Sequence, residues 1–359
     1  MRKIMTVVGA RPQFIKVAPV SRVLRHSFEE LIVNTGQHYD YKMAGVFFEE
    51  LGIPKPDYDL GIGSSTHGKQ TGLMLDKIEE LLIAEKPEGV LVYGDTNSTL
   101  AGALAASKLH IPLFHVESGL RSFNKKMPEE VNRILTDHVS QLLFAPTETA
   151  VRNLSNEGII NGVSNIGDVM YDAVLYNTEL TEKQYDLHQH FGVESGSYYL
   201  ATIHRAENTD DKNRLKAILS SIASIPGKVI LPLHPRTKAR INEFGLDEFL
   251  GATNLMIIDP VSYLEMILLE KNAKGIVTDS GGVQKEAYFM KVPCFTLRSE
   301  TEWVETVECG WNRLVNPETE CLSDYMNQEI TQPYSPNLFG NGQASHKIVT
   351  GIKEFFGDF

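Results

Sequence analysis

The chain has 359 residues, 42% of them hydrophobic and 22% charged, which is typical of a globular protein with more than one domain. Its formal net charge of −12 argues against a nucleic-acid or acidic membrane partner, but it does not exclude an anionic substrate bound by local arginines. Three cysteines, Cys294, Cys309 and Cys321, lack the spacing of a metal site or a disulfide framework. With no secretory signal and no apolar run of about 20 residues, we expect a cytoplasmic protein without metal or membrane partner.

The first half of the chain alternates short apolar strands with amphipathic helices. Strands are expected at 3–9, 31–34, 89–93, 112–116 and 141–145. Helices are expected at 12–25, 41–51, 66–85, 97–109, 129–139 and 147–157. Because strands that alternate with helices pair in parallel, this pattern predicts an α/β domain with a doubly wound sheet, at 1–170.

A polar segment from about Tyr171 to Ser197 interrupts this rhythm, and we expect the linker near its start. A second alternation follows, with strands at 198–203, 228–233, 255–258, 275–278 and 293–297 and helices at 211–224, 236–246, 261–271 and 282–290. A helix at 344–355 ends the chain without a partner strand. The pattern therefore predicts a second doubly wound domain, and such domains bind ligands at the carboxyl ends of their strands.

Charged residues follow nearly every predicted strand in both domains. The candidates are Arg11, Lys16, Asp95, Glu117, Arg121, Glu129, Glu130, Arg133, His204, Arg205, Glu207, His234 and Arg236. Each has a structural alternative: Asp95 as a helix cap, Glu129 and Glu130 as first-turn helix charges, His204 as a buried histidine, Arg121 and Arg133 as solvated side chains. Their common place at strand ends favours a functional interpretation, since purely structural roles would scatter them.

The stretch GIVTDSGGVQKEAY, at 275–288, reads as a strand, a glycine turn and a helix. Such a turn leaves backbone N–H groups of Ser280, Gly281 and Gly282 at the positive end of a helix, which suits a phosphate or a sugar hydroxyl. Glu286 lies one turn further and suits the two hydroxyls of a ribose. An ordinary helix cap is the alternative.

Two glycine-rich stretches do not match nucleotide-binding motifs. GSSTHGKQ, at 63–70, has Gln70 where a P-loop needs Ser or Thr for magnesium, and GNGQAS, at 340–345, does not follow a strand. We therefore expect no nicotinamide and no other cofactor.

Taken together, these stretches resemble the non-hydrolysing UDP-N-acetylglucosamine 2-epimerases. The similar motifs are GARPQFIK at 9–16, GDTNST at 94–99, HVESGLRS at 115–122, PEEVNR at 128–133, HRAEN at 204–208, DSGG at 279–282 and TEWVE at 301–305. The resemblance implies two Rossmann-like domains in the GT-B arrangement, with the helix at 344–359 crossing back to the first domain and 171–343 binding UDP. It also implies a cytoplasmic homodimer that epimerises a UDP-sugar at C2 for surface polysaccharide or O-antigen lipopolysaccharide.

The resemblance assigns a role to each candidate residue. Ser280, Gly281, Gly282 and Glu286 would hold UDP, Arg11 and His204 would face the diphosphate, and Arg121, Arg133 and His234 would complete the substrate-binding set. Asp95, Glu117 and Glu129 would be the acid/base carboxylates, with Lys16 in the same site. These residue types also suit elimination of UDP to a glycal and its re-addition, which needs cations on the leaving diphosphate and carboxylates that move a proton. Gln37, His38, Gln70 and His234 correspond to the family's second, activating UDP-sugar site, whose retention stays open.

Several departures leave the substrate open. Gln13 and the pair Trp303-Val304 differ from the simpler UDP-N-acetylglucosamine enzymes, and RSFNKKMPEE at 121–130 is more similar to the branch that epimerises UDP-2,3-diacetamido-glucuronic acid. UDP-N-acetylglucosamine is the first expectation and the diacetamido acid the second. A GT-B glycosyltransferase, a hydrolysing epimerase and a non-catalytic UDP-sugar sensor are further alternatives.

Overall fold

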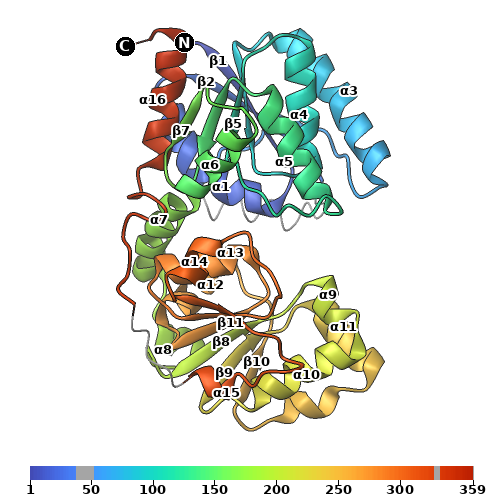
Figure 1. Cartoon of the computed structure of the whole chain (residues 1–359), viewed down its shortest axis with the longest axis vertical. Coiled ribbons are helices and arrows are strands. Elements are labelled where there is room, and N and C mark those ends of the chain that lie inside the picture. The colour runs from blue at the N-terminus through green and yellow to red at the C-terminus, as the bar shows by residue number, and fades with distance from the viewer. Residues whose placement is uncertain (38–51, 327–331, 359) are drawn as a thin grey trace. The chain divides into compact units, whose positions relative to one another are not determined.

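The computed structural model describes residues 1–37, 52–326 and 332–358 (Figure 1). The chain forms two compact units: unit 1 comprises Met1–Leu175 and Pro336–Phe359, and unit 2 comprises Tyr176–Ser335. The helix expected at 41–51, and His38, lie outside the described residues. Among the helices that the structure describes, none is long and apolar enough to cross a membrane.

Unit 1 is built around a parallel sheet which, in its described residues, has seven strands in the order β3-β2-β1-β4-β5-β6-β7. The strands are β1 (Lys3–Val8), β2 (Glu29–Asn34), β3 (Tyr58–Asp59), β4 (Gly89–Tyr93), β5 (Leu113–Val116), β6 (Leu142–Ala145) and β7 (Val163–Asn165). The strand order reverses between β1 and β4. Doubly wound sheets bind ligands beyond the carboxyl ends of their strands at such a point.

Helices cover this sheet and bury its apolar residues. They are α1 (Arg11–Leu24), α3 (His67–Glu85), α4 (Asn97–Lys108), α5 (Pro128–Val139), α6 (Glu148–Asn156), the start of α7 (Val169–Gln184) and α16 (Ala344–Phe356). One core cluster joins Met5 and Val7 of β1 to Met74 and Ile78 of α3. Because both faces of β1 and β4 are covered, these strands are continuous apolar runs, as a parallel sheet requires.

The C-terminal helix α16 belongs to unit 1, as the resemblance predicts (Figure 1). It packs against α1, and the rings of Phe355 and Phe356 lie 5.4 and 5.9 Å from that of Phe114. Arg2 and Asp358 form an ion pair at 2.8 Å. The contacts of α16 explain why a terminal helix without a partner strand is nonetheless part of a packed core.

Unit 2 repeats the same strand scheme. Its described residues form a six-stranded parallel sheet in the order β10-β9-β8-β11-β12-β13, so the reversal falls between β8 and β11. The strands are β8 (Tyr198–Thr202), β9 (Lys228–Pro232), β10 (Leu255–Ile258), β11 (Gly275–Thr278), β12 (Cys294–Thr296) and β13 (Asn312–Leu314). The helices are α8 (Leu187–Phe191), α9 (Ala206–Thr209), α10 (Lys212–Ala223), α11 (Pro235–Phe244), a 3₁₀ turn (Asp247–Gly251), α12 (Tyr263–Asn272), α13 (Gly281–Phe289), α14 (Val304–Glu308) and α15 (Ser323–Met326). Two doubly wound Rossmann-like units confirm the predicted fold class.

The polar segment after Tyr171, near whose start we expected the linker, is largely helical. It forms most of α7 and all of α8, and the boundary between the units falls inside α7. Buried positions of α7 carry Asn177 and Thr181, which are 0% and 1% exposed. Polar residues therefore occupy positions where an amphipathic helix usually has apolar ones. For this reason the sequence of α7 does not show the apolar periodicity of a helix.

Three short strands, β3, β7 and β13, were not predicted from the sequence. Each has two or three residues and lies at the edge of its sheet. Because edge strands are largely exposed, they carry no run of apolar residues to identify them.

Candidate active site

In unit 1, the loops that follow β1, β4 and β5 carry the charged residues expected there. Arg11 begins α1 directly after β1, Asp95 follows β4, and Glu117 follows β5. Thr96 caps α4 with its own hydroxyl, so Asp95 is not the helix cap. The capping alternative for Asp95 is thereby excluded.

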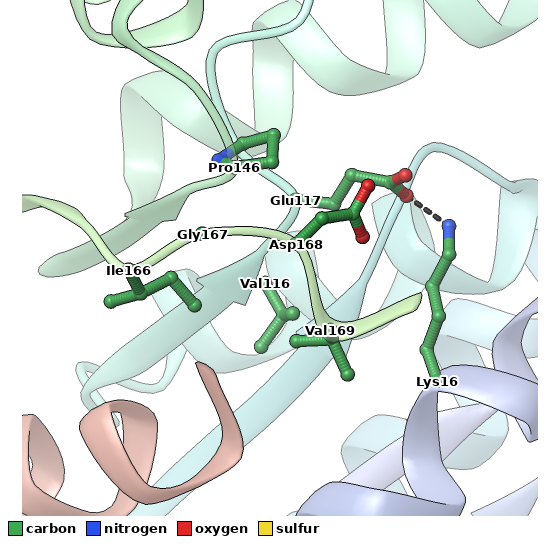
Figure 2. A pocket seen from close by; sticks show the side chains of 8 residues that line it. All are labelled: Lys16, Val116, Glu117, Pro146, Ile166, Gly167, Asp168 and Val169. Carbon is green, nitrogen blue, oxygen red and sulfur yellow. Dashed lines mark hydrogen bonds and ion pairs between the residues drawn. The ribbon is translucent and has the colours of Figure 1, made fainter. Parts of the chain in front are cut away.

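Lys16, on α1, forms an ion pair with Glu117, in a pocket that is also lined by Asp168 (Figure 2). The side chains of Lys16 and Glu117 are 12% and 11% exposed. Gly94 has a φ of +62°, and a Cβ there would lie 3.2 Å from Oε2 of Glu117. Glycine at this position therefore allows both the left-handed turn and the approach of the ion pair. Figure 2 shows the carboxylate of Asp168 turned toward the pair.

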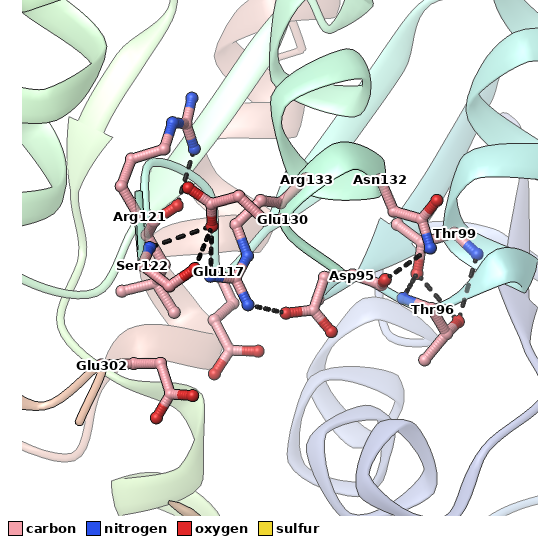
Figure 3. Close-up of polar contacts among 12 residues, drawn as sticks. Asp95, Thr96, Thr99, Glu117, Arg121, Ser122, Glu130, Asn132, Arg133 and Glu302 are labelled. Carbon is pink, nitrogen blue, oxygen red and sulfur yellow. Dashed lines mark hydrogen bonds and ion pairs between the residues drawn. The ribbon is translucent and has the colours of Figure 1, made fainter. Parts of the chain in front are cut away.

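Asp95 forms an ion pair with Arg133, on α5 (Figure 3). Arg133 also bonds Glu130 at 2.9 Å, and Asn132 donates to the main-chain oxygen of Asp95 at 2.9 Å. Burial alone would lower the pKa of Arg133, but the charge of Asp95 and its hydrogen bond outweigh burial and raise it. Arg133 is thus a buried, paired cation and not a solvated side chain.

Glu129 and Glu130 both lie in the first turn of α5 but face different surroundings. Glu129 is exposed, whereas Glu130 is 1% exposed and accepts hydrogen bonds from the amides of Ser122 and Phe123 at 2.9 and 2.8 Å. The sequence pointed to Glu129 and missed the inward position of Glu130. Glu130 orders the loop after β5, while Glu129 is accessible from solvent.

Arg121 is engaged by partners within unit 1. Its guanidinium bonds Asp137 at 2.7 Å and both carboxylate oxygens of Glu157 at 2.7 Å. Burial alone would lower the pKa of Arg121, but the two carboxylates raise it. We therefore leave Arg121 out of the substrate-binding set that we propose below, because its donors serve this network.

Gln37 and Gln70 form hydrogen bonds with the first residues of α4. The resemblance had placed both residues in an activating site. The side-chain oxygen of Gln37 accepts from the Ser98 hydroxyl at 2.7 Å, and that of Gln70 accepts from Asn97 at 2.8 Å. These contacts tie the segments before α4 to its first turn. They are compatible with a structural role.

In unit 2, the N-terminus of α13 faces out from the carboxyl end of β11. Ser280 caps the helix, and Gly281 and Gly282 are its first two residues. Neither glycine has a positive φ, and a Cβ on either would meet no described atom closer than 3.8 Å. The fold of unit 2 does not itself require glycine there, so the bare backbone leaves space for a ligand at the positive end of the helix.

His204 follows β8, next to this helix end. Its side chain is 45% exposed, and Nδ1 lies 3.2 Å from Oδ1 of Asp279. Asp279 also accepts from the main-chain amides of His204 and Arg205, at 3.1 and 3.0 Å. Burial alone would raise the pKa of Asp279, but these donors and the charge of His204 lower it. The buried-histidine alternative is excluded, because the outer side of the imidazole is accessible.

Arginines and a second histidine lie near the same loops. Arg298 is 4% exposed and bonds both carboxylate oxygens of Glu302, at 3.0 and 3.1 Å. A Cβ on Gly281 would lie 3.9 Å from the guanidinium of Arg205, which places this arginine beside the helix end. His234 caps α11, and its ring centroid is 6.1 Å from that of His204. Two arginines and two histidines thus lie around the loops near the start of α13.

Glu286 and Trp303 occupy buried positions around α13. Glu286 is 5% exposed and accepts a hydrogen bond from the hydroxyl of Tyr263 at 2.9 Å. Trp303 is also 5% exposed, and the ammonium of Lys285 lies 3.7 Å from the centroid of its ring. Trp303 therefore packs inside unit 2.

Asp168 and Arg298 are the main polar residues that the sequence did not single out. Asp168 follows β7, a strand too short to be recognised, and Arg298 follows β12, after which no charged residue was considered. Inspection of every strand end could have found Arg298. Among the described residues, no group of three or more His, Cys, Asp or Glu is arranged to hold a metal ion.

The chain is similar to known proteins over almost its whole length. The sequence profile of a family described as UDP-N-acetylglucosamine 2-epimerase matches residues 22–353. A Methanococcus maripaludis protein named UDP-N-acetylglucosamine 2-epimerase homolog is 56% identical, over 98% of this chain and 99% of its own. The Pseudomonas aeruginosa UDP-2,3-diacetamido-2,3-dideoxy-D-glucuronate 2-epimerase is 50% identical, over 97% and 98%. The structure of a Methanocaldococcus jannaschii UDP-GlcNAc 2-epimerase, in complex with UDP-GlcNAc and UDP, matches with a TM-score of 0.88 at 47% identity, over 98% and 99% of the two chains.

Proposed function

Because the chain belongs to the UDP-N-acetylglucosamine 2-epimerase family, we propose that it interconverts UDP-N-acetylglucosamine and UDP-N-acetylmannosamine. The reaction inverts one carbon of one substrate, so the enzyme is an isomerase. The observation that carries this proposal is the family match together with two ion pairs in unit 1, Lys16–Glu117 and Asp95–Arg133. They hold two carboxylates beyond neighbouring strand ends, and a positioned carboxylate can act as an acid or a base.

The chemistry of the sugar favours elimination over simple deprotonation. No carbonyl flanks C2 of an acetamido sugar, so a carbanion there is not stabilised. We propose that a carboxylate removes the C2 proton while the bond between C1 and the diphosphate oxygen breaks, its electron pair leaving with UDP and a C1–C2 double bond forming. UDP then adds back to C1 as a proton is delivered to the opposite face of C2. Atoms and electrons balance without an external oxidant.

We assign the proton-transfer steps to residues of unit 1. Glu117, paired with Lys16, and Asp95, paired with Arg133, are the buried or partly buried carboxylates. Glu129 is the third, and its exposure leaves it open to a bound sugar.

We assign nucleotide binding to unit 2. The free N–H groups at the start of α13 and the ring of His204 suit the diphosphate, and Arg11 of unit 1 is the remaining candidate for it. Glu286 suits the ribose hydroxyls. The family also supports a homodimer in the cytoplasm, acting in polysaccharide or O-antigen synthesis, as the finer part of this proposal.

A second substrate, UDP-2,3-diacetamido-2,3-dideoxy-glucuronic acid, is supported by one observation. The P. aeruginosa relative named for that sugar is as similar to this chain as relatives named for UDP-N-acetylglucosamine. Lys125 and Lys126, both exposed in the segment before α5, could bind the additional carboxylate.

Proton NMR of the protein with UDP-N-acetylglucosamine in D₂O tests the proposal. We expect deuterium to enter C2 of both epimers without any acceptor molecule. Epimerised product that keeps its original C2 proton would exclude the elimination route. A requirement for an acceptor would indicate a glycosyltransferase, steady release of UDP with free sugar would indicate a hydrolysing epimerase, and binding without turnover would indicate a sensor.

A further inference from the structure

His115, in β5, is a fully buried side chain that contacts the loop bearing Asp95 and a carboxylate on α5. Its Nε2 lies 2.7 Å from the main-chain oxygen of Gly94, the residue before Asp95. Its Nδ1 lies 2.7 Å from Oδ1 of Asp137, on α5. The imidazole therefore links the loop after β4 to a carboxylate on α5.

Both partners of the His115 ring are hydrogen-bond acceptors. The carbonyl of Gly94 has no proton to donate. Asp137 also accepts from Arg121 at 2.7 Å and from the amide of Gly119 at 3.1 Å, so it is surrounded by donors. Burial alone would raise the pKa of Asp137, but His115 and Arg121 outweigh burial and lower it. Both ring nitrogens of His115 therefore face hydrogen-bond acceptors.

Asp137 extends this link to the loop that carries Glu117. The amide that it accepts belongs to Gly119, two residues after Glu117. Glu117 has a φ of +71°, a left-handed conformation that a non-glycine residue keeps where its surroundings hold it. The amides of Glu117 and Ser118 both donate to Phe144, at 3.1 and 3.3 Å, and secure the other side of the turn.

Asp137 and Arg133 lie four residues apart and share the inner face of α5. Arg133 pairs with the carboxylate of Asp95, while Asp137 holds the loop of Glu117 and, through His115, the residue before Asp95 (Figure 3 shows the Arg133 contact). One helix face thus holds both carboxylate loops.

We propose that His115 and Asp137 are positioning residues that fix the separation of Asp95 and Glu117 through main-chain contacts. This inference rests on the proposed function, because it concerns the carboxylates assigned to proton transfer. His115 touches neither carboxylate and acts through Gly94 and, by way of Asp137, through Gly119. Loss of the link should misplace the carboxylates while leaving the residues assigned to UDP in unit 2 untouched.

The test compares His115→Gln with Glu30→Gln. Glu30 is a matched control, because it is also buried in unit 1 and accepts hydrogen bonds from Thr6 at 2.7 Å and Arg25 at 2.8 Å. We expect both variants to lower the melting temperature. His115→Gln should lower kcat roughly 10- to 100-fold, as small misplacements of reacting groups do, with KM and UDP affinity close to those of the parent. It should also release more glycal and UDP per turnover, and Glu30→Gln should change none of these kinetic quantities.

Amide hydrogen exchange provides a readout that does not depend on activity. In His115→Gln, the amides of Gly94 and Gly119 should exchange faster than in the parent, and in Glu30→Gln they should not. A folded His115→Gln protein with parental kcat, or with unchanged exchange at both glycines, would overturn the inference. So would a kcat loss of the same size in Glu30→Gln.

A measurement on the parent protein covers the case in which His115→Gln does not fold. The ¹⁵N-edited NMR spectrum of the parent should show a proton on Nε2 of His115, because its partner, the carbonyl oxygen of Gly94, can only accept. A ring without a proton on Nε2 would overturn the inference. If no deuterium entered C2 of the sugar with the parent enzyme, the proposed function would be refuted instead. The amide exchange rates of Gly94 and Gly119 and the NMR spectrum of the His115 ring would still decide the positioning role.

Discussion

The guanidinium of Arg133 is paired with the carboxylate of Asp95, although 38 positions separate them in the chain. The pair joins the first half of α5 to the loop after β4. The pair thereby holds the carboxylate of Asp95 beyond the carboxyl end of β4. This relationship leads to the first prediction.

Replacement of Asp95 by Asn should lower kcat by roughly 10²- to 10⁴-fold, the usual contribution of a positioned acid or base. Asn has the shape of Asp, so the fold should be retained, and UDP affinity should persist because the residues assigned to UDP lie mainly in unit 2. Steady-state kinetics and calorimetric titration with UDP measure the two quantities. Asp76→Asn, at an exposed position of α3, is the control and should change neither. Parental kcat in Asp95→Asn would remove this residue from proton transfer.

The carboxylates should act as a unit. If Asp95 and Glu117 serve one elimination, the variant Asp95→Asn/Glu117→Gln should lose little more activity than the slower of its two single variants. The three kcat values, measured with the same UDP-sugar, form a double-mutant cycle. Losses that multiply would indicate separate, independent roles for the two residues.

Replacement of Glu286 by Ala should weaken UDP binding. Hydrogen bonds to a charged group contribute about 1.5–3 kcal/mol, which corresponds to roughly 10- to 150-fold in Kd. Tyr263→Phe is the matched comparison, because it removes the hydroxyl that donates to Glu286 and keeps the carboxylate. Its effect should be smaller, about 1 kcal/mol or roughly fivefold. Equal affinities of Glu286→Ala and the parent would show that the ribose is bound elsewhere.

Unit 2 should lose stability in acid through Asp279. Its pKa is lowered in the folded state, because its donors and the charge of His204 outweigh burial, which alone would raise it. A carboxyl of this kind stabilises the fold above its unfolded pKa of about 4, and that stability is lost as the pH falls through the lower, folded pKa. Urea unfolding, measured from pH 7 down to acid conditions, should show that the free energy of unfolding decreases. In Asp279→Asn the free energy of unfolding should depend less on pH.

A suitable control for this experiment is Glu248→Gln, at an exposed position of the same unit. It should keep the parental pH dependence. An Asp279→Asn protein whose free energy of unfolding falls with acid as steeply as that of the parent would assign the effect to other groups.

The ratio of kcat/KM for the two candidate sugars decides the substrate. A preference of about 100-fold for the diacetamido acid, about 2.7 kcal/mol of transition-state binding, would replace UDP-N-acetylglucosamine as the natural substrate. Lys125→Ala/Lys126→Ala should then impair turnover of the acidic sugar alone. Arg121 is unsuitable for this role because Asp137 and Glu157 occupy its donors. Equal losses with both sugars would remove the two lysines from the specificity argument.

The sequence predicted the fold and the loops of the candidate site because both depend on local patterns. Apolar runs such as β4 alternate with amphipathic helices, and Asp95, Glu117 and His204 all follow recognisable strands. Such patterns specify which loop carries a charged side chain. They do not specify which partner it meets, because that depends on packing between distant segments.

Helix α5 shows why the partners were missed. Its buried positions are Glu130, Asn132, Arg133, Thr136 and Asp137, all polar, whereas Val131 and Leu135 are 41% and 44% exposed. Apolar periodicity therefore indicates the wrong face as the inner one. The same inversion concealed α7, whose buried positions include Asn177.

The return of α16 to unit 1 has a consequence for biosynthesis. Unit 2 lies between the two segments of unit 1 along the chain, so the ribosome synthesises unit 2 before α16. Phe114 in β5 packs against Phe355 and Phe356 of α16. Its ring therefore lacks these two partners until α16 has been synthesised. While unit 2 is being synthesised, the surface of unit 1 that α16 later covers is therefore exposed. Chaperones bind growing chains that expose apolar surface of this kind.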